Sequence, residues 1–163
     1  MSISFNFSTQ AIMKEIYAAS ALRCITNDSS YRVPPVLTRH SAPALQRLVK
    51  DAFAFVVMKF IAHVEACNLN GETASECNDA NNGDDMILSV DLRVPDGIST
   101  SIMGSMRVAV EHAIAAYSLH IAYIGHDDHA SKQYSQIAND EVAHLLQSLS
   151  MQHFNSPTIT PQY

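Results

Sequence analysis

The clearest pattern of apolar and polar positions runs from Met86 to Val94. Met86, Leu88, Val90, Leu92 and Val94 alternate with Ile87, Ser89, Asp91 and Arg93. This period of two is typical of a strand with one buried face. Ile3, Phe5 and Phe7 alternate with polar residues in the same way and predict a second strand. Because a lone strand leaves its backbone unpaired, we expect strand 86–94 to pair with the N-terminal strand, with part of residues 26–40, or with another copy of the chain.

Four other segments repeat their apolar residues at helical spacing. We expect helices over about residues 9–24, 41–67 and 99–124, and a fourth from Asp127 or Asp128 onward. Ser8 is a suitable N-cap, the second helix starts at Ser41 with Pro43 tolerated in its first turn, and Gly125 is suitable for ending the third helix. The predicted fold is therefore mainly α: a bundle of about four helices with a C-terminal antiparallel αα-hairpin and a small two-stranded β element.

The third helix is too apolar for a surface helix. Its strongly polar residues between Val108 and Ile124 are Glu111, His112, Ser118 and His120. We expect it to be a central helix that is buried on several sides, and we expect other copies of the chain to cover what one copy leaves exposed. The candidate residues for core or subunit contact are Leu88, Val90, Leu92, Tyr117 and Tyr134.

The remaining segments predict connectors and a tail. Residues 26–40 contain Pro34 and Pro35 and are expected to be extended, while residues 68–85 have few apolar side chains and are expected to be mobile. Residues 155–163 follow as an arm, in which Pro157, Pro161 and Tyr163 are candidates for a second contact. The predicted organisation is one helical domain over residues 1–154 and a flexible C-terminal arm over residues 155–163.

Charge and composition exclude several classes of function. The net charge is −6 and the basic residues form no cluster, so sequence-specific binding to nucleic acid is not expected. No segment is both long and apolar enough to span a membrane, and residues 1–7 do not form a signal peptide, so we expect synthesis in the cytoplasm. The three cysteines, Cys24, Cys67 and Cys77, are expected to be reduced, with a Cys67–Cys77 bridge as the disfavoured alternative.

Two groups of residues carry a metal hypothesis. Glu141 and His144 share one helix face, although di-iron bundles need this motif twice together with two further carboxylates, for which Glu15, Glu65 and Glu111 are the candidates. His126, Asp127, Asp128 and His129 could hold zinc with His63 or His120, but helix capping explains the two Asp residues. A metal-dependent helical-bundle enzyme that uses Glu141, His144, His126 and His129 is therefore an alternative function.

Other catalytic patterns are weak. Residues 79–85 resemble a calcium loop, but the glycine is one position early and no Glu follows at the required distance. Gly104-Ser105-Met106 lacks the flanking residues of a nucleophile elbow, and the chain has no phosphate-binding loop. We therefore expect no enzymatic activity and no cofactor. A small cytoplasmic adaptor that binds one partner is a further alternative.

Several short strings occur in a recognisable order. They are Phe-Ser-Thr-x-x-Ile-x-x-x-Ile-Tyr-Ala from Phe7, Pro-x-Leu-Thr from Pro35, Leu-Val-x-Asp-Ala-Phe from Leu48, and Leu-x-Val-x-Leu-x-Val-Pro from Leu88, followed by the hairpin with Tyr117 and Tyr134. Together they resemble a family of small helical proteins encoded among head and tail genes of phages and prophages of Bacteroidetes. The resemblance implies a head–tail connector or tail component that forms a ring or other oligomer, contacts neighbouring phage structural proteins and ends up in the virion.

Overall fold

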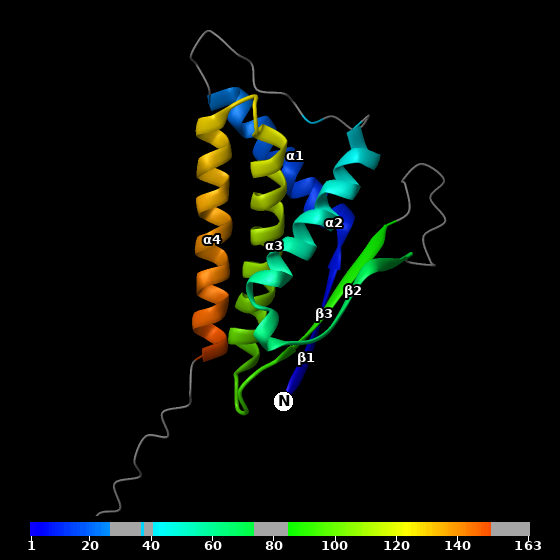
Figure 1. The fold of residues 1–163 in the computed structure, drawn as a ribbon, viewed down its shortest axis with the longest axis vertical. Coiled ribbons are helices and arrows are strands. Elements are labelled where there is room, and N and C mark those ends of the chain that lie inside the picture. The colour runs from blue at the N-terminus through cyan, green and yellow to red at the C-terminus, as the bar shows by residue number, and fades with distance from the viewer. Residues whose placement is uncertain (27–36, 38–40, 74–84, 151–163) are drawn as a thin grey trace, which may run out of the picture.

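The fold is built from helices and one small sheet. The computed structural model describes residues 1–26, 37, 41–73 and 85–150. In chain order, the elements are β1 (Ser2–Ser8), α1 (Thr9–Thr26), α2 (Ala42–Lys59), a short 3-10 helix η2 (Ile61–His63), β2 (Val64–Thr73), β3 (Met86–Arg93), α3 (Thr100–Tyr123) and α4 (Asp128–Ser150). The mainly α class and the C-terminal αα-hairpin are confirmed (Figure 1).

The strands form one antiparallel sheet in the order β1-β3-β2. β1 pairs with β3 over its whole length, with Phe5 opposite Val90 and Phe7 opposite Leu88. These four side chains are at most 6% exposed, which confirms that one face of the sheet is buried. Of the three partners that the sequence left open for this strand, the N-terminal strand is the one that the structure shows. Both edges of β3 are occupied within the chain, so β3 does not need another copy as its partner.

β2 corrects two of the sequence predictions. The second helix was expected to reach Cys67, but α2 ends at Lys59 and the chain becomes strand at Val64. Residues 68–73 were expected to be mobile, yet they belong to this strand, so the sheet has three strands instead of two. The chain forms a strand here because the second edge of β3 needs a partner for its backbone hydrogen bonds. In addition, Asn68, Asn70 and Gly71 have low helix propensity. Residues 74–84 lie outside the described part of the chain.

The helices lie on the sheet in successive layers. α1 contacts β1 and β3, whereas α2 contacts β2 and β3, so these two helices cover the apolar face. α3 packs on both of them, and α4 packs chiefly against α3 as the outermost helix (Figure 1). The rings of Phe7 on β1 and Phe53 on α2 lie 6.1 Å apart, where the sheet meets the helices. The core is therefore continuous from the sheet to α4.

α3 is the central helix that the sequence predicted. It packs against α1, α2 and α4, and its buried residues are Met106, Ala109, Val110, Ala113, Ile114, Ala115, Ala116, Ser118, Leu119 and Tyr123. Three helices of the same chain therefore cover most of its apolar length. The expectation that α3 needs other copies of the chain for its burial is not supported by this packing.

At the ends of α3 the structure shows a serine cap that was not predicted and confirms the predicted glycine stop. Ser99 caps its N-terminus, where the Ser99 hydroxyl accepts a hydrogen bond from the backbone N–H of Ile102. At the other end Gly125 has a φ of 76°, a conformation that costs little only for glycine. The backbone N–H of His126 then donates to the carbonyl of Tyr123, which turns the chain toward α4. This turn makes the αα-hairpin possible.

Candidate functional site

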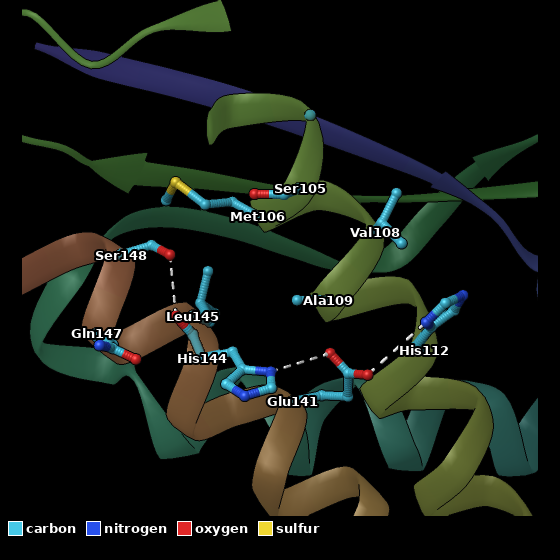
Figure 2. A pocket seen from close by; sticks show the side chains of 11 residues that line it. Ser105, Met106, Val108, Ala109, His112, Glu141, His144, Leu145, Gln147 and Ser148 are labelled. Carbon is cyan, nitrogen blue, oxygen red and sulfur yellow. Dashed lines mark hydrogen bonds and ion pairs between the residues drawn. The ribbon is translucent and has the colours of Figure 1, made fainter. Parts of the chain in front are cut away.

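Four ionisable side chains from three helices form a row, which we call the Glu–His row. It consists of Glu15 on α1, His112 on α3, and Glu141 and His144 on α4. Nε2 of His112 lies 3.7 Å from Glu15 Oε1, and Nδ1 of His112 lies 3.8 Å from Glu141 Oε1. The other oxygen of Glu141 lies 4.0 Å from His144 Nδ1. Figure 2 shows the Glu141 carboxylate between the two imidazole rings.

A pocket of about 590 Å³ adjoins the Glu–His row. It lies between the first half of α3 and the second half of α4 (Figure 2). Its lining consists of Gly104, Ser105, Met106, Val108, Ala109, His112, Glu141, His144, Leu145, Gln147 and Ser148. The two serine hydroxyls donate to helix carbonyls, Ser105 to Ile102 and Ser148 to His144. In the part of the chain that the structure describes, neither serine is paired with a base as a catalytic nucleophile would be.

The pKa of Glu15 is raised from its ordinary value, chiefly by burial. Burial raises the pKa of Glu15, His112 opposes that rise, and Glu111 and Glu141 add to it. Repulsion between carboxylates thus contributes to the raised pKa of Glu15. The sequence placed Glu141 and His144 on one helix face and named Glu15 as a carboxylate candidate, and the structure brings these three together. His112 joins them through the crossing of α1, α3 and α4, which no local pattern shows.

The geometry does not gather a set of metal ligands. Within the described residues, no group of three or more His, Cys, Asp or Glu side chains could hold a metal ion. Glu65, another candidate carboxylate, lies on β2 and accepts a hydrogen bond from Arg93 at 3.0 Å. Nδ1 of His120 lies 2.8 Å from the hydroxyl of Ser131 on α4, so this imidazole links two helices.

The predicted zinc site at the turn after α3 is a helix cap. Asp127 accepts a hydrogen bond from the backbone N–H of Ala130 at 2.9 Å, and its other oxygen lies 2.8 Å from Nη2 of Arg23 on α1. The hydrogen bonds from Ala130 and Arg23 lower the pKa of Asp127. His126 and His129 are exposed beside it. The Asp127 carboxylate therefore links the αα-hairpin to α1 through a hydrogen bond and an ion pair.

The last residue of the calcium-like segment is also a cap. Asp85 accepts hydrogen bonds from the hydroxyl of Ser8 at 2.8 Å and from the backbone N–H of Gln10 at 3.2 Å. A carboxylate in this position stabilises the N-terminus of α1. The predicted N-cap, Ser8, accepts from the N–H of Ala11 at 3.1 Å. The rest of the segment, residues 79–84, lies outside the described residues.

The predicted contact residues fall into three groups. Leu88, Val90 and Leu92 are fully buried in the core of the chain itself, so they are core residues and are not available to another subunit. Tyr117 and Tyr134 are half-buried, and each stacks on another aromatic ring: Tyr117 on Phe55, and Tyr134 on Tyr123. The candidates in the arm, Pro157, Pro161 and Tyr163, lie outside the described residues.

A strip of exposed apolar side chains on α2 and η2 was not predicted. Phe55, Met58 and Ile61 are 39%, 65% and 53% exposed, and we call them the α2 patch. Phe55 and Met58 widen the apolar stripe of α2 beyond its buried face. Phe55, Met58 and Ile61 follow one another at intervals of three residues, apart from the buried face of Val49, Ala52 and Val56. This spacing was the signal for an exposed apolar strip that the sequence contained.

The cysteines and the helices add two further observations. Cys67 is exposed on β2 and carries a free thiol, whereas Cys77 lies outside the described residues. Among the helices that the structure describes, none combines the length and hydrophobicity needed to cross a bilayer.

Comparison of the sequence with protein-family models, with curated proteins and with solved structures finds no match.

Proposed function

We propose that this protein is a non-enzymatic structural component of a phage-type particle, at the head–tail junction or in the tail. The sequence resemblance described above supports the link to phage particles. An assembly role is supported by one structural observation, the exposed α2 patch of Phe55, Met58 and Ile61. Exposed clusters of large apolar side chains are typical of surfaces that bind other proteins.

The aromatic member of the patch is held in place before any partner binds. The Phe55 ring stacks on Tyr117 of α3, with ring centroids 4.0 Å apart and planes 7° apart. The ammonium of Lys59 lies 4.7 Å from the centre of the Phe55 ring. A fixed aromatic side chain loses little conformational entropy on binding, which is the property of an interface anchor.

The partner that fits this patch is another copy of the chain. Lys59 gives the patch a positive edge, and a protein with a net charge of −6 offers carboxylates to meet it. The apolar side chains of the patch then become buried between copies. In this proposal, the α2 patch is one surface through which copies join, and neighbouring particle proteins bind to the resulting assembly.

Light scattering on the purified full chain tests this proposal. We expect the mass of the wild-type protein to rise above that of a monomer with concentration, and we expect the double substitution Met58→Glu and Ile61→Glu to reduce that mass at least twofold. The control pair, Val108→Glu and Ile137→Glu, adds the same charge at exposed apolar sites on α3 and α4 and should leave the mass unchanged. Equal masses for wild type and the α2 patch variant would refute the proposed contact.

A further inference from the structure

The free edge of the sheet at β1 carries backbone groups that point away from the chain. The Met1 amino group donates to the Val94 carbonyl at 3.3 Å, and the Val94 N–H donates to the Met1 carbonyl at 2.9 Å. Along two antiparallel strands, residue pairs that exchange backbone hydrogen bonds alternate with pairs that do not. Because Met1 and Val94 exchange theirs, Ile3, Phe5 and Phe7 also exchange backbone hydrogen bonds with β3. The backbone N–H and C=O groups of the alternate residues must therefore face outward; these residues are Ser2, Ser4 and Asn6.

These outward groups are open to a partner. The side chains of Ser2, Ser4 and Asn6 are exposed, and β1 pairs with β3 alone among the described strands. Natural proteins protect such edges with charged side chains, proline or bulges. β1 has none of these features over Ser2–Ser8, and its pairing with β3 is regular throughout.

The opposite edge of the sheet is different. β2 has two irregularities in its pairing with β3, between Val64 and Ala66 and between Asn68 and Glu72. It also carries the charged residue Glu65, whose side chain is exposed. These features disfavour regular pairing along the outer edge of β2. The sheet is therefore protected at one edge and ready to pair at the other.

We propose that β1 pairs antiparallel with β1 of a second copy, about a twofold axis at Ser4. In this register Ser4 faces Ser4 of the second copy and Ser2 faces Asn6 of the second copy. Every outward backbone group of these residues finds a partner, which gives about six main-chain hydrogen bonds. The two three-stranded sheets then form one continuous sheet.

The side chains on both faces suit this pairing. On the buried face Ile3 is only half-buried at the sheet edge, and in the dimer it meets Phe5 of the second copy and becomes covered. On the open face the paired residues are serine and asparagine, so no like charges oppose each other. The charges on that face lie on the neighbouring strand β3: Asp91, which accepts a hydrogen bond from the Ser4 hydroxyl, and Arg93 opposite Ser2.

This inference rests on the proposed assembly role but uses a separate surface, so the two can fail independently. In the background that carries Met58→Glu and Ile61→Glu, the β1 pairing predicts a dimer. Adding Ser4→Lys places two ammonium groups opposite each other at the twofold axis and should convert the dimer into a monomer. Ser89→Lys, on the same face of the central strand β3, is the matched control and should leave the dimer intact.

A proline substitution tests the backbone directly. Ser4→Pro removes an N–H that points away from β3, so the pairing within the chain keeps its hydrogen bonds. We expect this variant to be monomeric with an unchanged circular dichroism spectrum. Hydrogen exchange at Ser2, Ser4 and Asn6 should slow with protein concentration in the α2 patch variant, and it should remain fast in Ser4→Lys. Fast exchange at every concentration would refute the pairing even if Ser4→Pro did not fold.

Disulfide formation tests the register. In a chain whose three cysteines are replaced by serine, Ser4→Cys places two thiols in a facing pair whose Cα atoms lie about 5.5 Å apart, within reach of a disulfide. We expect a covalent dimer on mild oxidation. Asn6→Cys faces Ser2 of the second copy instead and should remain uncrosslinked. A dimer that crosslinks through Asn6→Cys and not through Ser4→Cys would overturn the proposed register.

Discussion

At the scale of single residues, Asp127 links α4 and α1 through its carboxylate, and its backbone N–H donates a hydrogen bond to the Tyr123 carbonyl of α3. It caps α4, follows the turn after α3, and pairs with Arg23 of α1. We expect Asp127→Ala to lower the free energy of unfolding by about 1–2 kcal/mol at pH 7, because the cap and the Arg23 contact are both lost. Urea titration measures this effect. Asp128→Ala, which removes an exposed carboxylate one residue further on, is the control and should have a smaller effect.

The same residue predicts a dependence on pH. The folded protein lowers the pKa of Asp127 below its ordinary value of 3.8, so the ionised form is the one that stabilises the fold. Its contribution is present above the unfolded-state pKa and is lost as pH falls through the folded-state pKa. The difference in stability between wild type and Asp127→Ala should therefore shrink in acid. A difference that persists unchanged below about pH 3 would contradict this account.

Glu15 should behave in the opposite way. Its pKa is raised chiefly by burial and also by Glu111 and Glu141, so the ionised carboxylate weakens the fold. The stabilisation from its protonated form is complete below the unfolded-state pKa and is lost as pH rises through the folded-state pKa. We therefore expect Glu15→Gln to be more stable than wild type at pH 7, with a difference that disappears near pH 4. Thermal unfolding of both proteins across this range measures it, with Asp51→Asn on α2 as an exposed control.

At the scale of elements, two glycines should respond to alanine with opposite signs. Gly125 has a positive φ, so Gly125→Ala should destabilise the turn between α3 and α4 by about 1 kcal/mol. Gly104 is exposed within α3 with open space around it, so Gly104→Ala should stabilise the helix by about 0.5–1 kcal/mol. Chemical denaturation of both variants tests the pair. Similar changes in both would show that φ at Gly125 is not the cause.

Elements were predictable from the sequence where local signals agree with the packing. Ser8 and Gly125 marked ends of helices, and strict alternation marked β1 and β3. The prediction was wrong after Phe60, where an apolar segment continues the helical pattern. In the structure this segment leaves the helix and pairs with the free edge of β3 as β2. That choice depends on a strand more than twenty residues away, so no window around Val64 contains the information.

At the scale of the whole molecule, the sequence predicts which segment is buried better than it predicts which elements cover it. α3 was correctly placed at the centre, but its partners are the helices of its own chain. On α4 the apolar side chain of Ile137 is 46% exposed. The Glu–His row needed the crossing of three helices to bring His112 beside Glu15 and Glu141. Such contacts between distant elements are set by topology.

The order in which the strands are made has a consequence for synthesis on the ribosome. Met1 hydrogen-bonds with Val94, 93 residues further along the chain, so β1 emerges long before its partner exists. During that interval the uncharged segment Ser2–Ser8 has neither edge paired, and nascent chains on one polysome bring many such segments close together. A chaperone that holds the segment Ser2–Ser8 until β3 has been translated would therefore raise the yield of correctly folded protein.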